Sequence, residues 1–136
     1  MAEGGCLCGK VRYRVEGPPL RVGYCHCRMC QRASGAPLVA WIGWPAERFA
    51  LIRGEPASFA SSAKGVRSFC PACGSQLLFR DPRGAGEVEV TLASLDDPAA
   101  FRPQEHIWTA SRFPWLELAD RLPRHEGAPP GDRAGE

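Results

Sequence analysis

The stretch Tyr24-Cys25-His26-Cys27-Arg28-Met29-Cys30-Gln31 contains three of the chain's seven cysteines. The other four form two close pairs, Cys6/Cys8 near the start and Cys70/Cys73 past the middle. A disulfide framework favours an even number of cysteines in a secreted chain. Because the number here is odd and the cysteines are clustered, the pattern indicates metal ligation. It predicts a closed site from the outer pairs and an open site from the central three.

The outer pairs predict a closed tetrahedral site. In an extended segment, residues two apart share a face, so Cys6 and Cys8 can point at the same ion. The segment Cys70-Pro71-Ala72-Cys73-Gly74 has the spacing of a metal knuckle, in which two residues turn under the ion and a glycine follows. Four thiolates saturate zinc, so this site would be structural. The alternative is that Cys6 and Cys8 are simply small buried hydrophobic residues.

The central cysteines predict an open site. If residues 24–27 are extended and a helical turn begins near Arg28, then Cys25, Cys27 and Cys30 converge on one point while His26 points away. Three protein ligands plus one open position is the arrangement of catalytic zinc. A zinc ion held by three thiolates is a weak Lewis acid, so the site suits a substrate thiol as its fourth ligand. Two alternatives stay open: His26 is a fourth ligand, or a distant residue completes a second structural site.

Length and composition indicate one soluble globular domain. The chain has 136 residues, of which 44% are hydrophobic and 24% are charged. No apolar run approaches the ~20 residues of a membrane helix, and no leader pattern follows Met1, so we expect a cytoplasmic protein without a membrane partner. Seven bound thiolates would subtract seven charges and two zinc ions would return four, which changes the formal charge from +2 to −1. This balance gives no support for nucleic-acid binding.

Two further groups of side chains have both a functional and a simpler interpretation. Five cations could meet a substrate carboxylate, although each is better explained as a solvated surface charge. They are Arg28, Arg32, Lys64, Arg67 and Arg112. The four tryptophans fit the core or its rim better than a ligand cage. They are Trp41, Trp44, Trp108 and Trp115.

The fifteen glycines and thirteen prolines indicate many turns and a mainly β fold. Alternating patterns predict strands at 10–16 and 87–92, with the even-numbered residues of the second strand facing inward. Other apolar runs predict strands at 20–24, 38–42, 49–52, 66–69 and 76–79, the last two forming a hairpin around the second cysteine pair. Helical signals are limited to 28–34, ended by Gly35, and to one turn at 98–101. The sequence predicts a folded domain at residues 2–125 and a disordered tail at residues 126–136.

The cysteine groups and their surroundings resemble the glutathione-dependent formaldehyde-activating enzyme family, which includes centromere protein V. The resemblance covers about residues 2–125 in the family's order. It is carried by residues 4–9, 11–13, 25–32, 34–35, 67–75, 92–98, 106–108 and 111–115. The three cysteine groups taken together make this pattern highly specific.

The resemblance implies a β-tent, a fold of antiparallel sheets around a structural zinc. It implies that Cys6, Cys8, Cys70 and Cys73 are structural ligands and that Cys25, Cys27 and Cys30 hold an active zinc, giving two zinc ions per chain. It also implies a carbon–sulfur lyase that joins a small thiol such as glutathione to a small aldehyde such as formaldehyde, giving S-hydroxymethylglutathione, or reverses that reaction. The alternative function is a non-catalytic zinc scaffold or protein-interaction domain.

Overall fold

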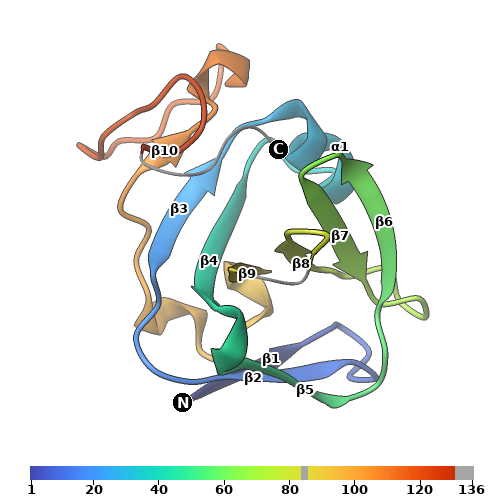
Figure 1. The fold of residues 1–136 in the computed structure, drawn as a ribbon. Coiled ribbons are helices and arrows are strands. Elements are labelled where there is room, and N and C mark those ends of the chain that lie inside the picture. Colours follow the sequence, from blue (N-terminus) through green and yellow to red (C-terminus); the bar gives the residue numbers. More distant parts are fainter. Residues whose placement is uncertain (84–85, 131–136) are drawn as a thin grey trace.

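The computed structural model describes residues 1–83 and 86–130, which form two sheets (Figure 1). The smaller sheet has the order β1-β2-β5 and lies at the base in this view. Its strands are β1 (Ala2–Gly5), β2 (Arg12–Val15) and β5 (Phe49–Arg53). The larger sheet has the order β10-β3-β4-β9-β8-β7-β6. Its strands are β3 (Arg21–Cys25), β4 (Val39–Pro45), β6 (Ala57–Ser62), β7 (Gly65–Phe69), β8 (Gln76–Arg80), β9 (Glu87–Thr91) and β10 (His106–Ile107).

Helical structure in the described ranges is limited to one short α-helix and several 3-10 turns. Helix α1 (Arg28–Ser34) begins after Cys27, whose Sγ accepts the Cys30 N–H, and ends at Gly35 with φ 73°. A glycine in this left-handed conformation terminates a helix without steric cost. The 3-10 turns are η1 (Ala46–Arg48), η2 (Leu92–Ser94), η3 (Pro98–Ala100) and η4 (Thr109–Ser111). The prediction of a mainly β fold with one or two helical turns is confirmed.

The main hydrophobic core lies between the small sheet and one face of the large sheet. Tyr13 and Val15 of β2 pack in the same cluster as Ile42 and Trp44 of β4 and Val90 of β9, and each of these side chains is at most 1% exposed. Each such side chain contributes about 1.5–3 kcal/mol relative to leaving it in water. The two sheets are therefore held together by hydrophobic burial as well as by the chain connections.

The other face of the large sheet is also covered. A second cluster contains Cys25, Val39, Trp41 and Phe79. The sequence predicts that Glu89 and Thr91 of β9 face outward, but they are only 6% and 9% exposed. That prediction is wrong because the alternating pattern of one strand cannot reveal a second layer contributed by distant segments. The expected strands agree in place with seven of the observed ones, whereas β1, β6 and β10 were not predicted.

Gly54 is a position where the close approach of two backbones requires glycine. Its φ is +73°, and a Cβ there would lie 2.0 Å from the Lys10 carbonyl oxygen, whereas Gly17 has φ +77° with nothing within 4 Å. We expect Gly54→Ala to lower the free energy of unfolding by at least about 3 kcal/mol and Gly17→Ala by about 1 kcal/mol, because only the first adds a clash to the strain. Urea unfolding of the two zinc-loaded variants measures this. Equal losses would contradict it.

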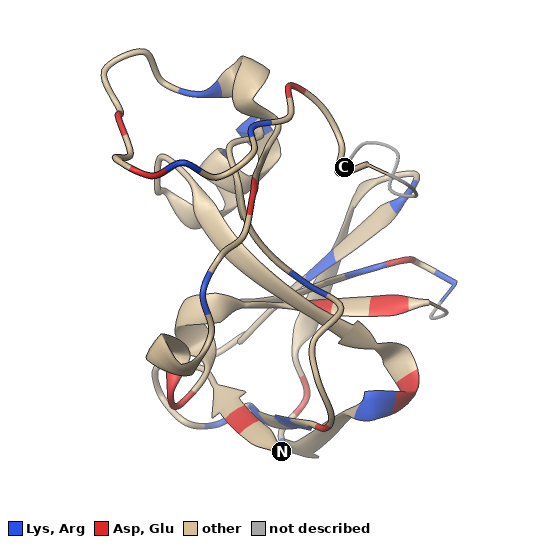
Figure 2. Cartoon of the chain, turned by 90° about the vertical axis from the view of Figure 1, so that its left-hand side faces the viewer, with Lys and Arg blue, Asp and Glu red and all other residues tan. Residues whose placement is uncertain are grey.

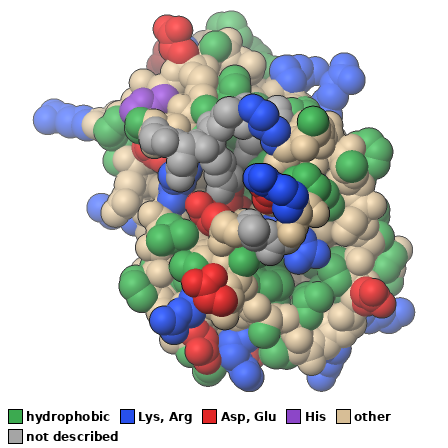
Figure 3. Space-filling view, viewed as in Figure 1, with side chains coloured by type: hydrophobic (Ala, Val, Ile, Leu, Met, Phe, Trp, Pro, Cys, Tyr) green, Lys and Arg blue, Asp and Glu red, His purple; other side chains and the backbone are tan. Residues whose placement is uncertain are grey.

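Basic and acidic residues are interspersed along the chain (Figure 2). The face seen in Figure 3 likewise alternates charged and hydrophobic side chains. In the part of the chain that the structure describes, no helix has both the length and the apolar character needed to cross a bilayer.

Near the C-terminus, the carbonyl of Gly127 accepts the Trp108 N–H at 2.9 Å. The rest of the predicted tail, 131–136, lies outside the described residues.

Candidate metal centres

Four cysteines from two distant segments meet at the first centre. The Sγ atoms of Cys6, Cys8, Cys70 and Cys73 all lie within 4.8 Å of one another. Two of the separations are 3.6 Å, for Cys6 and Cys8, and 3.8 Å, for Cys8 and Cys70. Gly74 has φ +79° and donates its N–H to the Cys70 carbonyl at 2.8 Å, which closes the turn beneath the sulfurs. The four-thiol set fits a closed tetrahedral zinc site.

Neighbouring polar groups prepare these sulfurs for metal ligation. The Val11 N–H donates to the Cys6 Sγ at 3.2 Å. The Ser75 hydroxyl lies 3.1 Å from the Cys73 Sγ, and hydrogen bonds from Ser75 lower the pKa of Cys73 to about 5. Because the thiolate is the form that binds metal, these hydrogen bonds favour ligation by Cys73.

The second centre is a group of three cysteines, which we call the trio: Cys25, Cys27 and Cys30. Cys25 ends β3, Cys27 caps α1, and Cys30 lies in the first turn of α1. Their Sγ atoms lie within 4.8 Å of one another, and the side chains are 0%, 6% and 0% exposed. Three convergent soft sulfur donors fit zinc as a ligand set. The predicted convergence across a strand-to-helix junction is confirmed.

His26 lies between two trio residues in sequence but points to a different set of partners. Its Nε2 is 2.9 Å from Nδ1 of His106, and Nε2 of His106 is 2.9 Å from Oδ2 of Asp120. Burial lowers the pKa of His26 to about 4, so the ring is neutral at pH 7. This geometry argues against His26 as a fourth ligand. The hydrogen-bonded chain instead ties the residue between Cys25 and Cys27 to β10 and to Asp120.

Arg67 of β7 lies against the trio. It is 5% exposed, and its Nη1 and Nη2 are 3.7 Å and 3.6 Å from the Cys30 Sγ. Its guanidinium carbon lies 5.2 Å from the Phe79 ring centre and 6.0 Å from that of Trp41. The simpler interpretation of Arg67 as a solvated charge is therefore wrong. The other four candidate cations, Arg28, Arg32, Lys64 and Arg112, are exposed.

Trp108 packs against the trio's cluster with an unusual backbone conformation. Its φ of 56° makes it the one non-glycine residue with positive φ among the described residues. Such strain costs about 1–3 kcal/mol and concentrates at functional sites. Its Nε1 and that of Trp41 are buried donors for which the described part of the chain offers no acceptor. Trp115, by contrast, is 72% exposed and is not a core residue.

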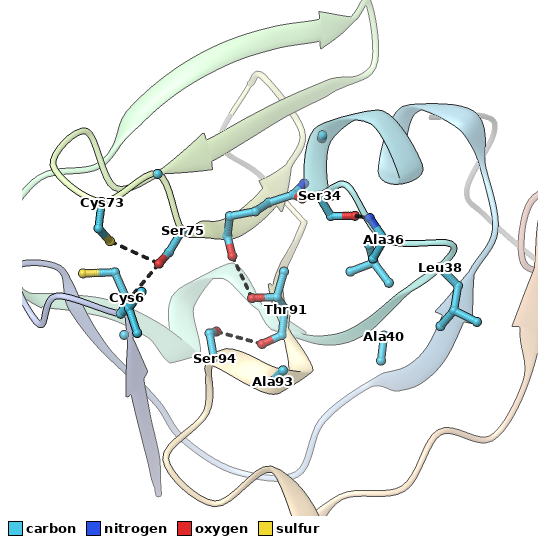
Figure 4. A pocket seen from close by; sticks show the side chains of 16 residues that line it. Cys6, Ser34, Ala36, Leu38, Ala40, Cys73, Ser75, Thr91, Ala93 and Ser94 are labelled. Atoms are coloured by element: carbon cyan, nitrogen blue, oxygen red, sulfur yellow. Dashed lines mark hydrogen bonds between the residues drawn. The ribbon is translucent and has the colours of Figure 1, made fainter.

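A pocket of about 600 Å³ adjoins the first centre, whose Cys6 and Cys73 line it (Figure 4). Cys6, Cys73 and Ser75 lie at one end, and Ser34 with Ala36 at the other. Its walls are mostly small side chains and hydroxyl groups, and apart from Cys6 and Cys73 of the first centre the residues that line it are uncharged. Val39 lines the pocket and also packs in the trio's cluster, so the pocket reaches the layer of side chains around the second centre, although none of the three trio cysteines lines it.

Comparison with known proteins supplies the family. Residues 1–111 match the family described as glutathione-dependent formaldehyde-activating enzyme. The chain belongs to this family. A relative from Halomonas elongata, provisionally named as a glutathione-dependent formaldehyde-activating enzyme, is 28% identical over 130 residues, which cover 89% of this chain and 83% of the relative. The resemblance seen in the sequence is thus confirmed, and it supports a function related to glutathione and formaldehyde.

A solved structure supports the fold of this family member. The crystal structure of a Rhodobacter sphaeroides protein matches with a TM-score of 0.57 and 24% identity, covering 69% of this chain and 87% of the other. The family match ends at residue 111. Asp120, which completes the hydrogen-bonded chain from His26, lies beyond that limit, and no motif in the sequence marked it.

Proposed function

We propose that this family member catalyses formation or cleavage of the carbon–sulfur bond between a small thiol and a small aldehyde, as a zinc-dependent carbon–sulfur lyase. The observation that carries the proposal is the difference between the two centres. One has four cysteine donors, whereas the other has three, all buried. A three-ligand site is typical of catalytic zinc and a four-ligand site of structural zinc. We infer one zinc ion in each.

The protein groups around the trio have distinct roles in this proposal. When bound, zinc would supply the positive charge that favours the thiolate form of the substrate. The pocket would hold the body of the thiol with its sulfur directed to the trio. The thiolate then forms a bond to the aldehyde carbon, the C=O π electrons move to oxygen, and that oxygen takes up a proton. The buried N–H groups of Trp41 and Trp108 are candidate donors to the developing oxyanion.

The pocket bears on the choice of thiol. Glutathione carries two carboxylates and an ammonium group, which bind best to charged partners. Because the lining offers no cation to the carboxylates of glutathione, and its only charged members would be the zinc-bound Cys6 and Cys73, the pocket suits a small thiol of low charge at least as well. The family name supports glutathione, so both kinds of thiol belong in the assay.

The test is exchange of formaldehyde with a thiol, followed by NMR with and without the zinc-loaded protein. Glutathione and 2-mercaptoethanol provide a charged and a neutral thiol. We expect the wild-type protein to accelerate exchange with at least one of them, and Ala72→Ser, an exposed change in the knuckle, to behave like wild type. Absence of acceleration with every thiol would favour the alternative of a non-catalytic zinc domain.

A further inference from the structure

A buried cation stands beside the trio. The two terminal nitrogens of Arg67 both face the Cys30 Sγ, at 3.6–3.7 Å, and the planar group is held by Phe79 and Trp41. In the strand register Arg67 pairs with Phe79, and Phe79 pairs with Glu89, so the three side chains share one face of the sheet. A guanidinium fork supported by aromatic rings is a preorganised donor to an anion.

The charge of the trio explains why a cation is needed there. Three thiolates and one zinc ion carry a net charge of −1, and a further anionic sulfur would make it −2. Concentrating negative charge in a buried place is costly because solvent cannot screen it. A guanidinium in contact with one of the sulfurs withdraws charge from it and offsets this repulsion.

We propose that Arg67 is a positioning and charge-compensating residue, whose hydrogen bonds to Cys30 allow the trio to accept the sulfur of a substrate as a further anion. The inference deepens the proposed function and rests on metal binding at the trio. It assigns Arg67 to the sulfur end of the substrate and not to its carboxylates. Replacing Arg67 must therefore weaken the binding of thiols with and without carboxylates by the same factor.

Glu89 is the opposite charge that faces the same layer. It is 6% exposed and lies on the far side of Phe79 from Arg67 in the register. Its carboxylate carries the opposite charge, so Glu89→Gln changes the same buried row of side chains by removing a negative charge, where Arg67→Gln removes a positive one. Arg48, an exposed residue of η1, provides a control for loss of a distant positive charge.

The experiment measures thiol binding to the cobalt(II)-substituted protein through the sulfur-to-cobalt charge-transfer absorption. The probes are 2-mercaptoethanol and glutathione. Arg67→Met and Arg67→Gln should weaken binding of both thiols by the same factor, about tenfold to hundredfold. Arg67→Lys should lose less thiol affinity than the neutral variants, because lysine keeps the positive charge but not the paired N–H donors of the guanidinium. Arg48→Met should bind as wild type, and Glu89→Gln should bind equally well or more tightly.

Several results would overturn the inference. These are unchanged binding in both neutral variants, weakening confined to glutathione, weakening by Glu89→Gln as large as by Arg67→Gln, or absence of any thiol-dependent absorption change in the wild type. Loss of cobalt from the trio in folded Arg67→Met or Arg67→Gln would also overturn the inference, because Arg67 would then be needed for metal binding itself. If Arg67→Met fails to fold, Arg67→Gln carries the test. If the thiols bind the cobalt protein as expected but the zinc protein does not accelerate formaldehyde exchange, the proposed function is wrong and this inference still holds.

Discussion

Replacing Cys70 with serine is expected to unfold the protein at room temperature. Cys70 is 1% exposed, belongs to the main core, and joins the β7–β8 turn to the segment that carries Cys6 and Cys8. Structural zinc contributes about 10–16 kcal/mol in small zinc domains. This is comparable to the whole stability of an ordinary domain, about 5–15 kcal/mol. Loss of one of four ligands therefore suffices to remove the folded state.

The measurement is circular dichroism together with zinc content per chain, and Ala72→Ser serves as the control. Ala72 lies in the same turn and is exposed, so serine there leaves all four sulfurs in place. A strong chelator added to the wild type should reproduce the unfolding of Cys70→Ser. A folded Cys70→Ser protein that still melts near the wild-type temperature would show that this cysteine group is not a structural metal site.

Replacing Cys27 should instead leave the protein folded, remove one zinc ion and abolish activity. Cys27 has two roles: it is one of the three sulfur donors, and its Sγ caps α1 by accepting the Cys30 N–H at 3.2 Å. Serine keeps the cap because its hydroxyl oxygen is a preferred N-cap acceptor, whereas alanine loses it. We expect both variants to lose formaldehyde exchange by more than about hundredfold, since they lack a direct metal ligand.

The serine and alanine variants of Cys27 separate ligation from capping. Cys27→Ala should be less stable than Cys27→Ser by about 1 kcal/mol, the usual value of an N-cap, with equal zinc content. Urea unfolding and metal analysis of the two proteins measure the difference. If Cys27→Ser unfolds in the same way as Cys70→Ser, the trio is a second structural site and the enzyme proposal loses its basis.

The local parts of the sites could be read from the sequence because they depend on short-range geometry. The predicted helix at 28–34 coincides with α1, and the predicted stop at Gly35 is the observed left-handed cap. The hairpin predicted around Cys70 and Cys73 is the observed β7–β8 pair. In each case the decisive groups lie within a few residues of one another, so the periods of strand and helix fix their relative directions.

The partners of these groups could not be read in the same way. Arg67 reaches Cys30 across 37 positions of sequence, and His106 reaches His26 across 80. Glu89 was expected in solvent because its strand alternates, yet it is buried. A period-two pattern identifies one buried face and says nothing about whether other segments cover the second.

The sequence by itself determined the family, the mainly β class and the division of seven cysteines into a group of four and a group of three, because spacing controls which sulfurs can converge. Only the tertiary structure decided that a guanidinium lies beside the trio, that His26 belongs to a separate hydrogen-bonded chain, and that a pocket without cationic side chains adjoins the first centre. These features depend on strands far apart in the chain meeting in one sheet, and side-chain packing across strands is not encoded in any local pattern.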